Sequence, residues 1–203
     1  MKFIPNLISS LRILLVIPTV YLLLNSQYSH ALLLFFVAGL SDGLDGFLAR
    51  RFGWTTRLGS FLDPMGDKLL MTASYFTLGW LGQLPIWLVA IVIGRDLVIV
   101  VGVLAYRFLV QDISMSPLLI SKANTVAQIF LVLLMLFKLS GLPMSDVPGW
   151  LSQGTMYLVM MTSLLSGLAY ILIWSKRAVD AMQEKNQPGK NQPSKNQSGE
   201  KQA

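Results

Sequence analysis

Long apolar runs alternate with short polar stretches along most of the chain. Six apolar segments lie at roughly 7–24, 31–49, 60–80, 85–109, 121–140 and 150–174. Each is close to the ~20 residues that an α-helix needs to cross the hydrocarbon core of a bilayer. The pattern therefore predicts an all-α integral membrane protein, in which six transmembrane helices joined by short loops form one bundle.

The lysines and arginines outside the helix centres gather at one end of the predicted helices. That end holds Lys2, Arg50, Arg51, Arg57, Arg107, Lys122, Lys176 and Arg177. At the opposite end, one loop has Lys138 as its only cation. Basic residues that flank membrane spans tend to stay in the cytoplasm. We therefore expect both termini in the cytoplasm. Arg12 interrupts the first apolar run and no small-x-small cleavage site follows it, so we expect a retained helix rather than a signal peptide.

The end of the chain has a different composition. Residues 183–203 contain KNQPG, KNQPS and KNQSG in tandem, with no recurring apolar residue. A segment that buries no apolar surface has nothing to offset the entropy lost on folding. We expect a membrane domain over 1–182 and a disordered cytoplasmic tail over 183–203.

Composition excludes several kinds of function. Charged residues make up 13% of the 203 residues, against about 25% in soluble domains. The net charge of +6 comes from cations at helix ends and in the tail, which favours anionic lipid head groups over nucleic acid as the partner. Cysteine is absent, and the single histidine is His30, which we expect in an outer loop. Disulfides, thiol catalysis and zinc–thiolate sites are therefore excluded.

Four aspartates stand out in this apolar chain: Asp42, Asp45, Asp63 and Asp67. A carboxylate at membrane depth is costly unless it is paired, binds a metal or faces water, and no matching cluster of lysines lies beside these four. Spacings of three and four residues put each pair on one helix face. If the second and third helices are antiparallel neighbours, all four meet near the cytoplasmic surface. Oxygen ligands suit Mg²⁺ or Mn²⁺, and four carboxylates can hold two such ions.

The same stretch carries a longer motif. Residues 42–50 read DGLDGFLAR, and Gly59, Asp63 and Asp67 follow at fixed spacings. This resembles the signature of the CDP-alcohol phosphatidyltransferases, Asp-Gly-x-Asp-Gly-x-x-Ala-Arg, then Gly, Asp and Asp, and every fixed position matches. Such a motif in a helix–loop–helix context is highly specific.

The resemblance implies a fold, a reaction and a set of site residues. It implies six helices, an active site on the cytoplasmic side, a homodimer and a place in a bacterial inner membrane. An acceptor hydroxyl would attack the lipid-bearing phosphate of CDP-diacylglycerol, and CMP would leave. The four aspartates would bind two divalent ions, and Asp67 would also act as the base. The CDP group would be held by Asn6, Gly46, Ala49, Arg50, Thr56 and Gly59.

The acceptor is predicted from polar residues in the fourth and fifth apolar segments, Arg95, Asp96, Lys122 and Asn124. One interpretation is that Arg95 and Asp96 neutralise each other or tie helices together, and that Lys122 marks a helix end. The other is that Arg95, Lys122 and Asn124 line a pocket for the acceptor phosphate. Ionisable residues within a membrane span favour the second interpretation.

Two branches of the family fit these residues. The chain reads GRD at 94–96 and SKANT at 121–125, which resembles the branch that uses phosphatidylglycerol and forms cardiolipin. The branch that uses glycerol 3-phosphate tends to have Arg-Glu and a second lysine. A phosphomonoester carries more negative charge than a phosphodiester lipid and gains more from that lysine. We therefore expect phosphatidylglycerol as acceptor, with glycerol 3-phosphate as the alternative. An ion-coupled transporter is the non-enzymatic alternative, but the acids cluster at one surface and no inverted repeat is visible.

Overall fold

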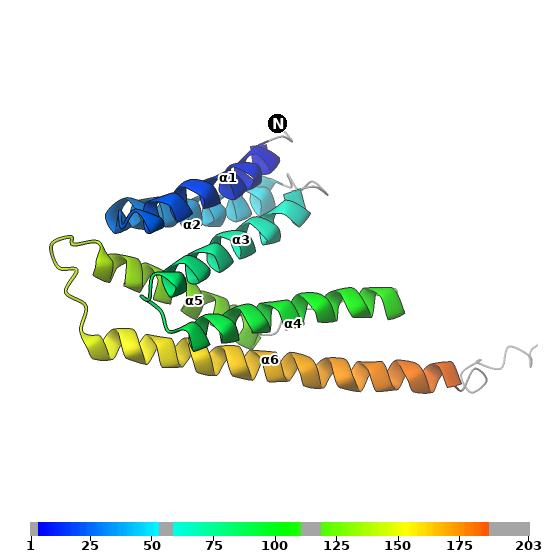
Figure 1. The fold of residues 1–203 in the computed structure, drawn as a ribbon. Coiled ribbons are helices and arrows are strands. Elements are labelled where there is room, and N and C mark those ends of the chain that lie inside the picture. Colours follow the sequence, from blue (N-terminus) through cyan, green and yellow to red (C-terminus); the bar gives the residue numbers. More distant parts are fainter. Residues whose placement is uncertain (1–3, 53–58, 111–118, 187–203) are drawn as a thin grey trace, which may run out of the picture.

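The computed structural model describes residues 4–52, 59–110 and 119–186, and describes side chains within 13–41, 66–102 and 119–175. Helices account for all the regular structure in these ranges, as Figure 1 shows. They are α1 (Ile4–Leu24), α2 (Tyr28–Phe52), α3 (Gly59–Trp80), α4 (Ile86–Val110), α5 (Leu119–Leu139) and α6 (Gly149–Asn186). The six apolar segments of the sequence are thus confirmed as helices.

Two connections show why the helices end where they do. At the end of α3, Gly82 has a φ of 70°, and the amides of Gly82 and Gln83 donate to the carbonyls of Gly79 and Leu78. These two bonds form a Schellman motif, which satisfies carbonyls left open at a helix end. The end of α1 has the same motif, but there Ser26 takes the left-handed conformation, with a φ of 56°.

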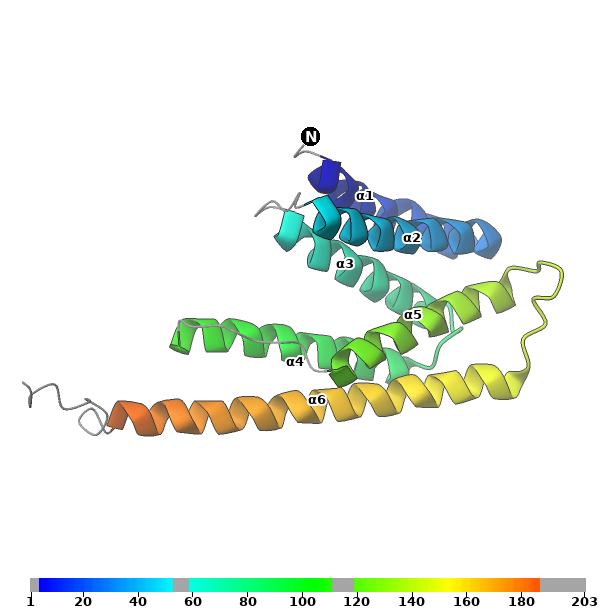
Figure 2. The ribbon, with the colours of Figure 1, turned by 180° about the vertical axis from the view of Figure 1, so that it is seen from behind.

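The helices form two groups. Figure 1 shows α1, α2 and α3 on one side and α4 and α6 on the other, with α5 crossing between them. In the first half-bundle (α1–α3), α1 packs on both α2 and α3; in the second half-bundle (α4–α6), α6 packs on both α4 and α5. Contacts of α5 with α2 and α3, and of α3 with α4, join the halves. From the turn at 81–85, α3 and α4 separate toward their other ends (Figure 2).

Over residues 163–168, α6 places small polar side chains inside and leucines outside. Ser163 and Ser166 are buried, whereas Leu164, Leu165 and Leu168 are exposed. This is the arrangement expected of a helix in lipid, where apolar side chains gain nothing by turning inward and small polar ones join helices. Within the described residues, α5 and the 149–175 part of α6 are long and apolar enough to cross a membrane. The six spans and the cytoplasmic termini stay predictions.

The last helix is longer than its apolar segment. It continues to Asn186, so the first residues of the predicted tail are helical. Residues 176–186 contain no glycine or proline and are rich in helix formers. Pro188 is the first residue that opposes a helix, and it also restricts the residue before it. The predicted disorder of the remaining tail falls on residues outside the described ranges.

Candidate functional site

The four aspartates lie on two helices whose adjoining ends are linked by residues 53–58. Asp42 and Asp45 lie on α2, and Asp63 and Asp67 lie on α3. Both helices are continuous through these positions, so each pair shares a face as its spacing predicts. The end of α2 and the start of α3 lie at the same end of the first half-bundle (Figure 2).

The described side chains include one of these carboxylates. Asp67 is partly buried, while the side chains of Asp42, Asp45 and Asp63 lie outside the described set. Among the described side chains no group of three or more His, Asp or Glu forms a metal site. The donor chemistry still fits a divalent ion, because carboxylate oxygens from two helices with adjoining ends are ligands that Mg²⁺ and Mn²⁺ prefer.

The residues predicted to hold CDP are placed by the backbone alone. Asn6 lies on α1, and Gly46, Ala49 and Arg50 follow the aspartates along α2. Gly59 is the first residue of α3, and Thr56 falls outside the described residues. These helices belong to the half-bundle that carries the aspartates, and the CDP contacts stay predictions.

Arg95 is buried in the second half-bundle and joins three helices. From α4, its Nη1 donates to Asp96 Oδ1 at 2.6 Å. Its Nη2 donates to Ser121 Oγ of α5 at 2.6 Å and to Ser166 Oγ of α6 at 2.8 Å. Its Nε has no hydrogen-bond acceptor among the described residues. The guanidinium is thus held in a fixed orientation, with one buried donor left over.

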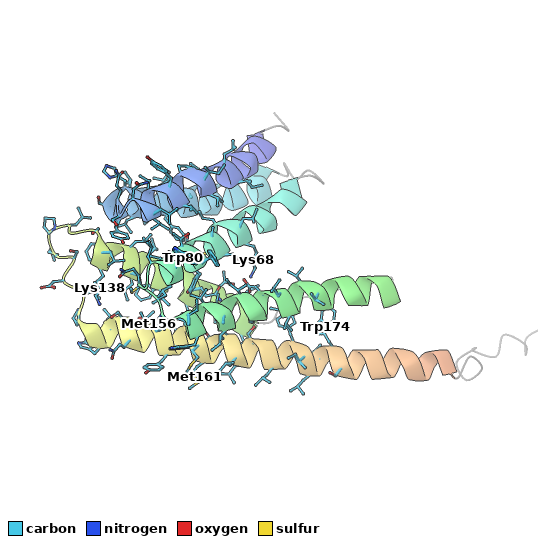
Figure 3. All side chains as sticks on the ribbon, in the orientation of Figure 1. Lys68, Trp80, Lys138, Met156, Met161 and Trp174 are labelled. Atoms are coloured by element: carbon cyan, nitrogen blue, oxygen red, sulfur yellow. The ribbon has the colours of Figure 1, made fainter. Side chains whose placement is uncertain are left out.

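Asp96 has a second cationic partner, which the sequence pattern did not predict. Lys68 Nζ lies 2.7 Å from the same Oδ1 that receives Arg95. Figure 3 shows Lys68 extending from α3 toward α4. The side chain of Lys68 is 46% exposed and that of Asp96 is 13% exposed. A lysine inside an apolar helix, next to Asp67, was the available signal, because such residues rarely lack a role or a partner.

Asn124 lies against α6. It is fully buried, and its Oδ1 accepts hydrogen bonds of 2.8 Å from the hydroxyls of Thr162 and Ser163. Its Nδ2 has no acceptor among the described groups. Asn124 and Arg95 thus contact neighbouring turns of one α6 face, whereas Lys122 is exposed. The structure brings Arg95 and Asn124 to one face of α6, and gives both of them contacts that tie helices together.

Comparison with known proteins agrees with the signature. Residues 2–176 match the CDP-alcohol phosphatidyltransferase family. The chain is 35% identical over 145 residues to the CMP-forming cardiolipin synthase of Rattus norvegicus, covering 64% of this chain and 48% of that protein.

Two further relatives represent both predicted branches. A probable CMP-forming cardiolipin synthase of Drosophila melanogaster is 32% identical over 192 residues, 83% of this chain and 56% of that protein. The CDP-diacylglycerol–glycerol-3-phosphate 3-phosphatidyltransferase of Pseudomonas fluorescens is 42% identical over 105 residues, 47% of this chain and 52% of that protein. The chain spans about half the length of these relatives. The family match extends from the first helix to the last, so the chain belongs to the CDP-alcohol phosphatidyltransferase family, which is a family of enzymes.

Proposed function

We propose that this protein transfers the phosphatidyl group of CDP-diacylglycerol to phosphatidylglycerol, forming cardiolipin and releasing CMP. The main support for phosphatidyl transfer is the complete motif from Asp42 to Asp67, which lies on two helices with adjoining ends. The choice of phosphatidylglycerol as acceptor is based on the GRD sequence of α4 and the SKANT sequence of α5. The names of the rat and fly relatives support the same acceptor.

The chemistry needs little from the chain beyond position and charge. Asp42, Asp45, Asp63 and Asp67 would hold two Mg²⁺ or Mn²⁺ ions, which supply positive charge for the pyrophosphate of the donor. Asn6, Gly46, Ala49, Arg50, Thr56 and Gly59 would hold the CDP group. Asp67 takes the proton of the acceptor hydroxyl, whose oxygen forms a bond to the lipid-bearing phosphorus. The phosphorus–oxygen bond to CMP breaks, so transfer is direct and Asp67 must lie within hydrogen-bond reach of that hydroxyl.

An anionic acceptor suits the surroundings of Arg95. Two cations, Lys68 and Arg95, share the carboxylate of Asp96, so these three described groups together carry a net positive charge. Buried Arg95 also keeps an Nε donor without an acceptor among the described residues. A phosphate oxygen is a strong acceptor for such a donor. Lys122 would supply a further cation at the edge of the pocket, and Asn124 would shape the pocket by holding α5 on α6.

Glycerol 3-phosphate is the second candidate acceptor, because the Pseudomonas relative, named for its use, shares 42% identity over its matched part. The test offers the purified full chain CDP-diacylglycerol with Mg²⁺ or Mn²⁺ and either acceptor, and identifies the lipid product. We expect cardiolipin and CMP. Efficient formation of phosphatidylglycerophosphate without cardiolipin would overturn the acceptor and leave phosphatidyl transfer standing.

The proposed substrates also suggest where the protein acts. Diacyl lipids reach an active site from within a bilayer, so the acceptor pocket would open sideways to the membrane near Arg95 and Lys122. We place the site at the cytoplasmic face of a bacterial inner membrane, in a homodimer, as the positive ends of the helices and the family resemblance suggest.

A further inference from the structure

The proposed site draws on both half-bundles. The four aspartates lie on α2 and α3 of the first half-bundle, and Arg95, Lys122 and Asn124 lie on α4 and α5 of the second. In phosphatidyl transfer, the acceptor hydroxyl must reach both Asp67 and the donor phosphorus. Its rate therefore depends on how the two half-bundles are placed relative to each other, since small displacements of reacting groups are costly.

The Lys68–Asp96 ion pair links the halves beside the proposed base. Lys68 follows Asp67 directly on α3, and Asp96 follows Arg95 directly on α4. The pair is 2.7 Å long, between Nζ and Oδ1. Because α3 and α4 separate from the turn at 81–85 (Figure 1), a contact at this level limits the distance between them.

The same contact also limits rotation of α3 about its axis. Successive residues of an α-helix point roughly 100° apart around the axis. Holding Lys68 toward α4 therefore sets the direction in which Asp67 points, and Asp63, one turn earlier, shares the face of Asp67. On the other side of the contact, Asp96 cannot move freely, because it receives Arg95 Nη1 at 2.6 Å. Arg95 is held in turn by Ser121 and Ser166.

We propose that Asp96 is a positioning residue, which through Lys68 sets the spacing and rotation of α3 relative to Arg95. This inference rests on the proposed function, because it concerns the placement of Asp67 and of the acceptor residue Arg95. In this role Asp96 acts through its two cationic neighbours, Lys68 and Arg95, rather than on a substrate directly. A carboxylate that served only to neutralise buried Arg95 would not need Lys68.

The first experiment is a double-mutant cycle on turnover. Asp96→Asn and Lys68→Met each remove the ion pair, and both are compared with the double variant and with Lys68→Arg, which retains it. CMP release is measured with the acceptor that the natural chain uses. We expect each single variant to lower kcat by about tenfold, with the KM for CDP-diacylglycerol unchanged. The double variant should lose no more than the worse single variant, and Lys68→Arg should keep most of the turnover.

A matched control comes from the other end of the bundle. Lys138 of α5 also makes a polar contact between helices, at 3.4 Å to Ser152 Oγ of α6, and Figure 3 shows it far from Lys68. Lys138→Met should leave kcat unchanged. Multiplicative losses in the double variant would overturn the proposal, and so would a rise confined to the acceptor KM, which would make Lys68 a direct acceptor contact.

The second experiment measures the position of α3 relative to α4 and does not depend on turnover. The chain has no cysteine, so Leu69→Cys on α3 and Val101→Cys on α4, both exposed, accept spin labels at two sites per chain. Mixing with excess unlabelled chain leaves only the distance within one chain of the proposed homodimer. Double electron–electron resonance should give a narrow distance distribution in the labelled protein. Asp96→Asn and Lys68→Met should shift or broaden it, and Lys138→Met should not.

An unchanged distribution in both ion-pair variants would overturn the positioning role. The two experiments also separate this proposal from the proposed function. If the natural chain uses neither phosphatidylglycerol nor glycerol 3-phosphate, the proposed function fails, while the distance measurement still decides whether Asp96 sets the placement of α3.

Discussion

Asn124 of α5 accepts a hydrogen bond of 2.8 Å from Ser163 of α6, at a position with no solvent exposure. Thr162 lies at the same distance from the same oxygen. Asn124 is the residue whose identity resembles the phosphatidylglycerol-using branch. It therefore also joins α5 to α6, the two helices that bind Arg95. A change here acts on stability as well as on charge, and a test must separate the two.

Asn124→Lys should have two effects. An ammonium in a buried site loses its hydration, so the melting temperature in detergent should fall. The folded enzyme should use glycerol 3-phosphate better relative to phosphatidylglycerol, because one charge-assisted contact contributes roughly 1.5–3 kcal/mol. That corresponds to a shift in preference of about tenfold or more. The ratio of the two kcat/KM values measures this shift.

Asn124→Met is the matched control for that prediction. Methionine is a long, uncharged side chain, so it removes the hydrogen bonds to α6 and adds no cation. It should lower the melting temperature, and any change in the acceptor ratio that comes from the shape of the pocket should be smaller than that of Asn124→Lys. If Asn124→Lys shifts the ratio no further than Asn124→Met does, the charge at this position has no part in acceptor choice.

The sequence predicts the helices well and the polar contacts between them poorly. Each apolar run is a helix in the structure, because run length and composition are properties of a single segment. The partners of Arg95 depend on how α4, α5 and α6 rotate against one another. Ser121 and Ser166, which bind it, are common small polar residues without a distinguishing local pattern. Lys68 was missed for a related reason, since its partner lies on another helix.

The aspartate motif, unlike these contacts between helices, depends only on spacing within single helices. The spacing of Asp42 and Asp45, and of Asp63 and Asp67, is a property of single helices, so the continuous α2 and α3 preserve it. The end of α6 was predicted only in part. Hydropathy ends near residue 174, but the helix continues to Asn186 because local propensity, rather than lipid, supports its last turns.

Ser26→Gly should stabilise the fold. Ser26 holds a φ of 56° at the end of α1, where a residue with a Cβ atom is strained by about 1–2 kcal/mol. Glycine removes that strain but adds freedom to the unfolded chain, an opposing effect of about 0.4–1 kcal/mol. We expect a small rise in melting temperature. Gly82→Ser, the converse change at a φ of 70°, should lower it, and a rise in both variants would contradict this account.

Turnover should depend on a divalent ion. The four aspartates offer only oxygen ligands, and Mg²⁺ commonly binds through carboxylates together with substrate phosphates. Excess chelator should abolish CMP release, and adding Mg²⁺ or Mn²⁺ back should restore it. Full turnover in excess chelator would exclude a role for the metal in transfer.

Asp67→Asn should separate base function from metal binding. Asparagine is nearly the same shape as aspartate and offers an oxygen ligand, but it cannot take the proton of the acceptor hydroxyl. The variant should bind CDP-diacylglycerol with metal and turn over at least about a hundredfold more slowly, the lower end of the usual contribution of a general base. Asp42→Asn and Asp63→Asn are the matched variants, because they remove a ligand charge and leave the base. Their turnover should recover in part at high Mg²⁺, whereas that of Asp67→Asn should not. Turnover by Asp67→Asn at the natural rate would show that another group accepts the proton.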